Sequence, residues 1–451
     1  MKRYLTILQL ENYNIIRYIR WLFNNIGVKK IEYKKDLKYT PKIKLIIGLS
    51  VLQFLYIIYA LFSLTHNILI TTVFSILFLT QFYLFFIIST MILLPIDYYF
   101  ISRAINKTKQ KILHSKKLQT IAITGSYGKT STKEILYQLI KDKFKTLRTP
   151  ESYNTILGIA KTIEYELDKT YEIFICEMAA YKKNDIKILC NMVQPHYGVI
   201  TGLTSQHLER FGNFQNIIEA KFGLYDSIYN KNNIIFNLSN KHILSEIKKR
   251  NINKPNGYIN ASNIVLNKYG TSFEIKYKNK IYKIKTSLFG FSNIENILGA
   301  LTMALKLNLE IGYLISKIEN LNQISNRFEL KKFGESTIVD NTFSSNEISF
   351  KEMLKTARKV NGTKVLITPG LVELGIDEAE KHYRLGLMIN RIFDTIILVG
   401  NSNRTKSIAK GLKGNFEFID DTRNEYVNKV NQLKNKYDWI FLENDLTQNY
   451  N

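Results

Sequence analysis

The sequence predicts an α/β protein with three parts: an N-terminal two-helix transmembrane hairpin, a central domain with a mostly parallel sheet, and a smaller doubly wound α/β domain. Three observations predict this fold class. Residues 45–96 contain no Asp, Glu, Lys or Arg. From about residue 118, short apolar segments alternate with helical patterns, and from about residue 321 this alternation restarts. We therefore expect boundaries at 1–117, 118–320 and 321–451.

The first 44 residues are basic and mixed in composition. Arg17 and Arg20 lie among apolar and aromatic residues with helical spacing, which predicts an amphipathic helix. The sequence leaves open whether this helix lies on a membrane surface or packs on the domain behind it. The residues concerned are Leu8, Leu10, Tyr13, Ile16, Tyr18, Trp21 and Leu22.

The uncharged stretch is too long for one membrane-spanning helix, because such a helix would be more than twice the ~30 Å thickness of the hydrocarbon layer. We expect two spans, 45–64 and 68–94, separated at Thr65-His66-Asn67. Both outer flanks are basic, which places them in the cytoplasm and the short turn outside. The alternative is a helical hairpin buried in a soluble protein.

The charge and the cysteine content limit which partners and which cellular compartment the protein can have. The net charge is +25, and residues 1–120 carry 17 Lys and Arg against 4 Asp and Glu, a difference of +13. This uneven distribution favours a membrane surface over nucleic acid as the partner. Cys176 and Cys190 lie in apolar or mixed stretches without metal-ligand spacing, which indicates buried thiols in a reducing cytoplasm.

Short apolar runs predict the strands of the two α/β domains. The polar segment 264–286 alternates with period two and predicts antiparallel strands, and 293–307 predicts an apolar helix. The parallel strands expected in the central domain are 120–124, 172–177, 197–201 and 233–237. Those expected in the C-terminal domain are 337–340, 364–368 and 395–399.

The segment 121–132, IAITGSYGKTST, has the pattern of a strand, a glycine loop and a helix. Gly125 and Gly128 allow backbone N–H groups to approach an anion, and the start of the helix adds its partly positive end. Lys129 would reach the outer phosphates of a nucleotide, and the Thr130 hydroxyl would bind Mg²⁺. The loop, GxxGKT, is shorter than the common P-loop pattern. The alternative is an ordinary strand–turn–helix connection.

Three further side chains are candidate catalytic or metal-binding residues because of their positions relative to the expected strands and helices. Glu177 ends an apolar strand, where a carboxylate can bind Mg²⁺ or orient water. His207 follows another expected strand, and Lys221 lies in a helical pattern fourteen residues later. Taken singly, each is also explained by a structural role: a solvated acid at a strand end, a loop histidine and a lysine on a helix face.

Together these segments resemble the Mur ligases, the ATP-dependent amide-forming enzymes of peptidoglycan precursor synthesis. The resemblance covers roughly residues 118–451 and is strongest to the branch that adds D-alanyl-D-alanine. It is carried, in chain order, by TGSYGKTST at 124–132, SYNTILGIA at 152–160, CEMAA at 176–180, TGLTSQHLERFGNFQNIIEAK at 201–221, GFSNIENILGA at 290–300, SNRFEL at 325–330, VDNTFSSN at 339–346 and PGLVELG at 369–375.

The resemblance implies the roles of individual residues. The loop that binds the ATP phosphates is Gly125, Ser126, Tyr127, Gly128, Lys129, Thr130 and Ser131. The adenine contacts Asn293 and Asn296, and the acyl substrate lies near Asn154 and Thr155. Arg327 and Asp340 close over the nucleotide from the C-terminal domain. Two Mg²⁺ ions are bound by Thr130, Glu177, His207 and Lys221, and Lys221 is carbamylated with CO₂. The residues implied in catalysis are Lys129, Glu177, His207, Lys221 and Arg327.

The implied activity is formation of an amide through an acyl phosphate. ATP converts a carboxylate into the acyl phosphate, an amine attacks it, and phosphate leaves. The protein must neutralise several anions and hold the reactants in line. The expected partners are a carboxylate precursor of peptidoglycan type, an amino acid or dipeptide such as D-Ala-D-Ala, and the cytoplasmic membrane. The catalytic domains would face the cytoplasm, and no nucleic acid is expected.

This sequence departs from the family pattern in two places. The N-terminal domain that holds the UDP-sugar is not recognisable, and the basic segment and apolar hairpin stand in its place. The acceptor is therefore either UDP-linked or lipid-linked. In VDNTFSSN, the branch usually has a second acid where Asn341 stands and an Asn-Pro pair where Asn346-Glu347 stands. These changes predict a different nucleotide or amine pocket.

Three other functions remain open from the sequence. A membrane-anchored polyglutamate-type synthetase belongs to the same superfamily, and PGLVELG at 369–375 argues against it. A membrane-tethered P-loop kinase would phosphorylate a lipid or sugar hydroxyl and would need a general base near the phosphates. A non-catalytic ATP-binding scaffold would not need Lys129, Glu177, His207 and Lys221 together.

Overall fold

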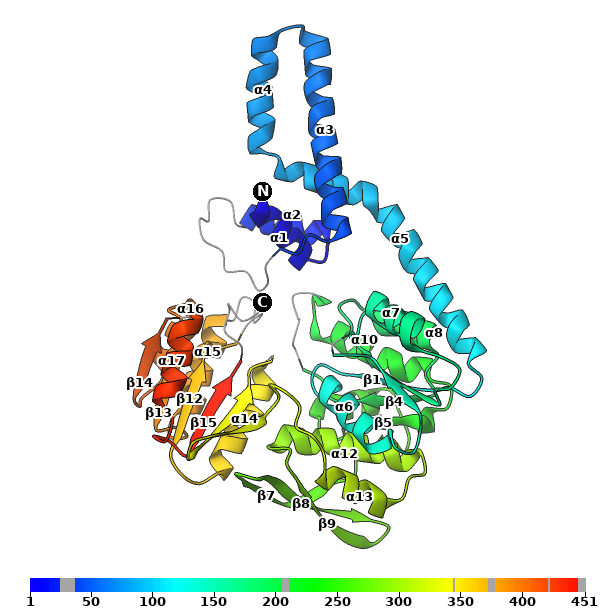
Figure 1. The fold of residues 1–451 in the computed structure, drawn as a ribbon, viewed down its shortest axis with the longest axis vertical. Helices are drawn as coiled ribbons and strands as arrows, with labels where there is room; N and C mark the ends of the chain where they lie inside the picture. Colours follow the sequence, from blue (N-terminus) through cyan, green and yellow to red (C-terminus); the bar gives the residue numbers. More distant parts are fainter. Residues whose placement is uncertain are drawn as a thin grey trace. The chain divides into compact units, whose positions relative to one another are not determined.

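The structure is a computed structural model, and it describes residues 1–24, 37–151, 153–204, 211–343, 345–371, 378–420 and 422–444. The chain divides into two compact units, one of residues 1–103 and one that begins at Ala104. We describe each unit by itself, because their relative positions are not determined (Figure 1).

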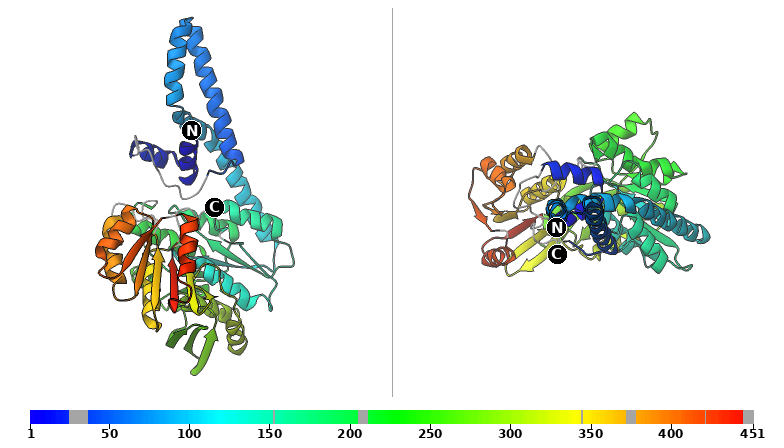
Figure 2. Two further views of the ribbon diagram at one scale, coloured as in Figure 1. Left: turned by 60° about the vertical axis from the view of Figure 1, so that its left-hand side comes forward. Right: turned by 90° about the horizontal axis from the view of Figure 1, so that it is seen from above.

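The first unit is helical. It contains α1 (Lys2–Leu10), α2 (Ile15–Asn24), α3 (Pro41–Thr65), α4 (Ile68–Thr80) and the first part of α5 (Tyr83–His114). Figures 1 and 2 show α3 and α4 side by side as a hairpin. The predicted amphipathic helix over 8–22 is thus two helices, since Asn12 and Tyr13 adopt left-handed backbone conformations between them.

The hairpin turns where the sequence predicts, but its second limb is not one helix. His66 ends α3 in a left-handed conformation, and Asn67 caps α4 by accepting a hydrogen bond from the Ile70 N–H (3.2 Å). The predicted span 68–94 is interrupted, because α4 ends at Thr80 and α5 begins at Tyr83. The break brings the ring of Phe82 against that of Phe54, with 5.6 Å between their centroids.

The second unit begins within α5 and contains the predicted central sheet. All its strand pairs are parallel, and the order is β2 (Thr146–Arg148), β3 (Ile173–Met178), β1 (Gln119–Thr124), β4 (Tyr197–Ile200), β5 (Ile234–Phe236) and β6 (Asn256–Gly257). The four predicted central strands are confirmed. The helices between the strands are α6 (Lys129–Ile140), α7 (Ile156–Glu166), α8 (Asp185–Val193), α10 (Phe214–Ser227) and α11 (Lys241–Lys249).

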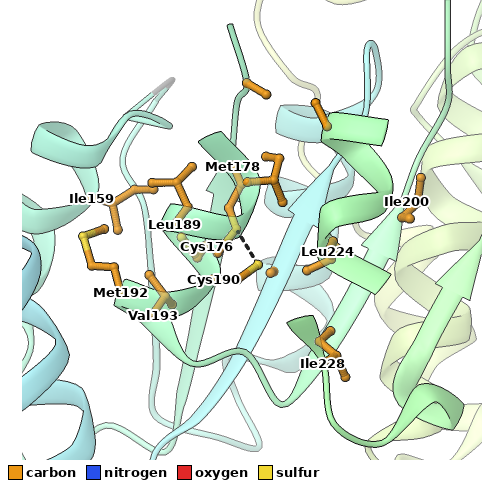
Figure 3. Packing of buried hydrophobic residues seen from close by; sticks show 14 of the residues in the cluster. Ile159, Cys176, Met178, Leu189, Cys190, Met192, Val193, Ile200, Leu224 and Ile228 are labelled. Carbon is orange, nitrogen blue, oxygen red and sulfur yellow. Dashed lines mark hydrogen bonds between the residues drawn. The ribbon is translucent and has the colours of Figure 1, made fainter. Parts of the chain in front are cut away.

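Separate hydrophobic cores cover the two faces of this sheet. One core contains Cys176 and Cys190, which are free and buried as expected, with Met178 beside Cys190 (Figure 3). The opposite core joins the sheet to α6 and to α12 (Phe291–Lys306) and α13 (Ile311–Glu319). It also includes one face of the predicted antiparallel sheet, β7 (Ala261–Asn267), β8 (Gly270–Tyr277) and β9 (Lys280–Thr286).

The C-terminal part has a second six-stranded sheet. Its order is β10 (Glu329–Phe333), β11 (Ser336–Asn341), β15 (Trp439–Glu443), β12 (Lys364–Thr368), β13 (Thr395–Val399) and β14 (Phe416–Ile419), and only β10 is antiparallel to its neighbour. The helices are α14 (Glu347–Lys359), α15 (Glu378–Ile389), α16 (Asn403–Gly411) and α17 (Arg423–Gln432). The doubly wound prediction is confirmed with an added antiparallel edge.

Candidate functional site

The glycine loop lies between β1 and α6 and is held by the segment that follows β4. The Ser126 N–H donates to the Gly202 carbonyl (2.7 Å), and the Thr204 N–H donates to the Ser126 hydroxyl (3.2 Å). The Thr201 hydroxyl donates to the Tyr127 carbonyl. The loop conformation is therefore fixed by hydrogen bonds with residues 201–204.

Gly128 is required for both conformation and space. It caps α6 with a φ of +78°, in the left-handed region. A Cβ atom there would lie 2.6 Å from Oδ1 of Asn296. Gly202 is equally confined, because a Cβ atom on it would meet the Tyr127 ring. The loop backbone therefore packs directly against α12, with no room for a side chain at Gly128.

The Lys129 side chain folds back across the loop. Its Nζ donates to the carbonyls of Gly125 (3.0 Å) and Ser126 (3.4 Å). Burial lowers the pKa of Lys129, the charge of Glu177 raises it, and the charge of Arg327 lowers it further. Lys129 thus lies close enough to Glu177 and Arg327, two other predicted site residues, for their charges to change its pKa.

Glu177 is buried at the C-terminal end of β3, and its side chain is 1% exposed. Its Oε1 accepts a hydrogen bond from Asn154 Nδ2 (2.9 Å). Its Oε2 has no hydrogen-bond partner among the described residues and lies 3.6 Å from Lys133 Nζ. A buried carboxylate oxygen without a hydrogen-bond partner is suited to act as a ligand of a bound cation.

Lys221 lies on α10 and is buried. Burial holds the pKa of its amine well below the usual range, and the charge of Lys129 lowers it further, against opposing effects of Asp185 and Glu177. An amine of lowered pKa is more often neutral, which is the form that reacts with CO₂. The residue environment therefore suits carbamylation.

Arg327 precedes β10, and the structure brings it to the central domain. Asn293 Nδ2 donates to the Arg327 carbonyl (3.4 Å), and the guanidinium stacks over the Phe343 ring at 4.1 Å from its centroid. Burial lowers the pKa of Arg327, and the charges of Glu177 and Glu134 raise it.

The two asparagines predicted to contact adenine lie on the first turns of α12 and are buried. Asn293 donates to the Phe289 carbonyl (3.0 Å) as well as to Arg327. Asn296 Oδ1 accepts from the Thr132 hydroxyl (3.3 Å) on α6. Both side chains thus join α12 to the segments that surround the loop.

The two predicted substrate residues begin α7. Asn154 is tied to Glu177, and its carbonyl accepts from the Ala179 N–H (3.0 Å). Thr155 is the N-cap of α7, where its hydroxyl accepts from the Gly158 N–H (3.4 Å). Thr155 therefore has a structural role in this helix in addition to any contact with substrate.

Asp340 lies at the end of β11, and local groups engage both of its carboxylate oxygens. Oδ1 accepts from the N–H (3.2 Å) and hydroxyl (2.7 Å) of Thr342, and Oδ2 accepts from Lys331 Nζ (2.6 Å). The neighbouring Asn341 donates through Nδ2 to Glu443 Oε2 (2.7 Å). In this structure the Asp340 carboxylate stabilises the turn that follows β11 through its hydrogen bonds with Thr342.

The remaining predicted residues divide into two groups. Thr130 and Ser131 form the first turn of α6, directly after Lys129, and Ser131 is buried. His207 lies outside the described residues. In the part of the chain that the structure describes, no group of three or more His, Cys, Asp or Glu could hold a metal ion. A Mg²⁺ site with few protein ligands and several phosphate or water ligands remains compatible with this arrangement.

Sequence reasoning missed two buried charged residues. Lys133 is fully buried and donates to the carbonyls of Thr149 (2.7 Å) and Glu151 (2.5 Å). Glu443 is fully buried at the end of β15, where it accepts from Asn341 and Ser345. The spacing from Lys129 to Lys133, one helical turn, was the available signal for the first.

A cavity of about 310 Å³ lies beside α12. Its polar lining includes Asn237, Tyr258, Glu295 and Lys355, and Asn237 Nδ2 donates to Glu295 Oε2 (3.1 Å). Burial raises the pKa of Glu295, and the charge of Glu352 on α14 raises it further. The cavity is thus lined by both the central domain and α14.

Comparisons with known proteins agree with this geometry. Residues 123–304 match the Mur ligase middle domain. The UDP-N-acetylmuramoyl-tripeptide–D-alanyl-D-alanine ligase of Buchnera aphidicola is 26% identical over 339 residues, which cover 72% of this chain and 74% of that protein. MurF of Acinetobacter baumannii has a similar fold at 21% identity, with a TM-score of 0.68 over 77% of this chain and 78% of that chain. MurF of Thermotoga maritima, in complex with ADP, is 22% identical and has a TM-score of 0.67 over 77% of this chain and 80% of that chain.

Proposed function

Because residues 123–304 match the Mur ligase middle domain and the chain resembles a UDP-N-acetylmuramoyl-tripeptide–D-alanyl-D-alanine ligase over 72% of its length, we propose that it is an ATP-dependent ligase that adds D-Ala-D-Ala to a peptidoglycan precursor. The observation that carries the proposal is the group of basic side chains around one buried acid. The charge of Glu177 acts on Lys129, Lys221 and Arg327, which come from three separate elements. Such a group suits a reaction that collects several anions in one place.

The residues of the chain divide the work of this reaction. The substrate carboxylate attacks the γ-phosphorus of ATP, ADP leaves, and an acyl phosphate forms. Lys129 and Arg327 would neutralise the transferring phosphoryl group from opposite domains. The amine then attacks the acyl carbon, and phosphate leaves as the amide forms. Arg327, which already lies at the central domain, would also help exclude water that hydrolyses the acyl phosphate.

Mg²⁺ would be held by Thr130, Glu177 and His207, with a second ion at carbamylated Lys221. The bound ions would supply positive charge that stabilises the phosphate oxygens. The Glu177 Oε2, which has no hydrogen-bond partner among the described residues, and the buried Lys221 amine support these assignments. Carbamylation would replace the cation of Lys221 by an anion and so turn it into a metal ligand. The adenine would lie along α12, at Asn293 and Asn296.

The first unit is proposed to anchor the enzyme in the cytoplasmic membrane, with the catalytic domains in the cytoplasm. Helices α3 and α5 are long and apolar enough to cross a bilayer by length and composition. Apolar side chains are exposed along the hairpin, from Leu45 to Phe100. Residues 45–65 of α3 extend about 31 Å at 1.5 Å per residue, close to the ~30 Å hydrocarbon thickness. The anchor supports a lipid-linked or otherwise membrane-associated acceptor.

A phosphate-release assay tests the function. The detergent-solubilised protein is incubated with ATP, Mg²⁺, D-Ala-D-Ala and either the UDP-linked or the lipid-linked tripeptide precursor. Release of inorganic phosphate that requires both the precursor and the dipeptide is expected. Transfer of phosphate into a stable product would instead indicate a kinase, and phosphate release independent of both substrates would contradict the ligase. Turnover of the UDP-linked form alone would contradict the lipid-linked acceptor.

A further inference from the structure

Among the described residues of the central domain, Lys133 is the most completely enclosed cation that the reaction scheme leaves without a role. It lies on α6 one turn after Lys129, and its side chain is 0% exposed. A lysine is rarely buried completely unless its charge is paired and its donors are used. Its partners therefore indicate why it is there.

The Lys133 ammonium bonds to the chain between β2 and α7. Nζ donates to the carbonyls of Thr149 (2.7 Å) and Glu151 (2.5 Å). Glu151 has a left-handed backbone conformation, with a φ of +40°, which a non-glycine residue rarely adopts without support. Lys133 thus stabilises a bend in the segment that leads directly to Asn154.

The same ammonium also faces the buried carboxylate of Glu177. Nζ lies 3.6 Å from Glu177 Oε2 and 3.3 Å from Glu134 Oε1. Glu177 is joined to the bend independently, since its N–H donates to the Thr149 hydroxyl (3.1 Å) and its Oε1 accepts from Asn154 (2.9 Å). One buried cation therefore links α6, β3 and residues 149–151.

We propose that Lys133 is a positioning residue that holds the Glu177 carboxylate and the acyl-substrate segment in register with the phosphate loop. This inference rests on the proposed function. Lys133 acts as the internal counter-ion of Glu177 and so fixes the position of its Oε2. It also orients Asn154 through the backbone of 149–151. Its ammonium already bonds to the Thr149 and Glu151 carbonyls and faces Glu177 and Glu134, which leaves no donor for a substrate.

The first experiment compares Lys133→Met with the wild-type protein. Met keeps much of the side-chain volume but removes the charge and the donors. We expect the Mg²⁺ concentration for half-maximal activity and the KM for the acyl substrate to rise at least about tenfold, as for partners of metal ligands elsewhere. The KM for the amine donor should stay within about twofold. Lys141→Met, an exposed lysine at the end of the same helix, is the matched control.

A binding measurement separates this inference from the proposed activity. The rise in melting temperature produced by ADP is titrated with Mg²⁺, which needs no turnover. Lys133→Met is expected to need at least about tenfold more Mg²⁺ for the same shift. An inactive wild-type protein would contradict the ligase function but not this result. A folded Lys133→Met variant with the wild-type Mg²⁺ dependence and acyl-substrate KM would overturn the inference.

A double variant covers the case in which Lys133→Met does not fold. Glu177→Gln leaves the buried Lys133 with Glu134 as its remaining counter-ion, and Lys133→Met leaves the buried Glu177 without the cation that lies 3.6 Å from its Oε2. Removing both charges should restore stability, so Lys133→Met/Glu177→Gln should melt at a higher temperature than either single variant. A double variant that is as unstable as the sum of the two single changes would show that Lys133 serves the fold alone.

Discussion

Glu177 shows what single residues contribute and how far the sequence could identify them. Its place at the end of an apolar strand was enough to make it a candidate, because the carboxyl ends of parallel strands meet at one edge. The structure adds that it faces Lys133 and that Asn154 holds one of its oxygens. Neither contact was predictable, because each joins segments whose meeting depends on sheet order.

Lys221 also shows that the sequence pattern alone does not identify the buried residues of the site. By helical pattern alone it is a solvated lysine, and only the resemblance gave it a role. The structure buries it and lowers the pKa of its amine. His207, the third candidate, lies outside the described residues and stays a prediction.

Lys221→Ala tests the carbamate. We expect the variant to fold normally, since it removes a costly buried amine, and to lose most of its ligase activity, by at least about 100-fold. Phosphate release and far-UV circular dichroism measure the two effects. Lys241→Ala, which changes an exposed lysine at the start of α11, is the control. Full activity of Lys221→Ala would remove the argument for a carbamate ligand.

Glu443 predicts a pH dependence of stability. Burial raises its pKa to about 8, although hydrogen bonds from Ser345 and Asn341 oppose this, and the ordinary value is 4.5. Between these pH values the unfolded chain releases the proton while the folded chain keeps it. Rising pH therefore favours unfolding from about 4.5 to about 8, and the effect is complete above about 8.

Glu443→Gln should remove this dependence, because the amide stays neutral at every pH. If the Asn341 amide turns over, Gln can keep both hydrogen bonds. Thermal unfolding at pH 5, 6.5 and 8 should show a smaller fall in melting temperature for the variant, by roughly a few degrees. Glu335→Gln, an exposed glutamate, should behave as the wild type. Equal pH profiles for wild type and Glu443→Gln would show that Glu443 is ionised when folded.

Elements with strong periodicity or with an apolar run between clear flanking signals were predictable, including the three-residue β5, and short strands without such a run were not. The strands β1, β3, β12 and β13 were expected within a residue of their ends. The strands β2 and β6 have only three and two residues, too few for any period. The run in β15 is apolar but follows a polar helical stretch, and only its pairing between β11 and β12 reveals it as central.

The start of α6 gives a prediction about the phosphate loop as an element. Gly128→Ala would place a Cβ atom in the left-handed region and 2.6 Å from Asn296 Oδ1. We expect a loss of about 1–2 kcal/mol in the free energy of unfolding and a strong loss of ADP affinity. Denaturant unfolding and ADP titration measure these effects.

Gly312→Ala is the matched control for this change. Gly312 lies in α13, and a Cβ atom there would meet nothing within 4 Å. It should gain about 0.5–1 kcal/mol in stability and keep the ADP affinity of the wild type. A Gly128→Ala variant that binds ADP normally would contradict the role of the loop.

At the scale of the whole molecule, composition indicated one apolar and two α/β regions, and this much was predictable. The break between α4 and α5 was not predicted, because Thr80 and Gln81 are the only local signal and stand in a mostly apolar run without Gly or Pro from residue 68 to 94. Helix α5 runs across the division between the two units at Arg103 and Ala104 and ends at His114, before residue 117, so the boundary expected at 117 stays a prediction.

The membrane anchor can be tested on the full chain with substitutions of equal exposure in different places. Leu55 on α3 and Leu77 on α4 are 54% and 53% exposed, and Val265 on β7 is 56% exposed. A carboxylate costs several kcal/mol in the hydrocarbon layer but almost nothing on a wetted surface. Leu55→Asp and Leu77→Asp should therefore shift protein from the carbonate-resistant membrane pellet to the supernatant, measured by immunoblot, while Val265→Asp should not. If the wild-type protein itself is found in the carbonate supernatant, the apolar hairpin does not enter the bilayer and must be covered by protein instead.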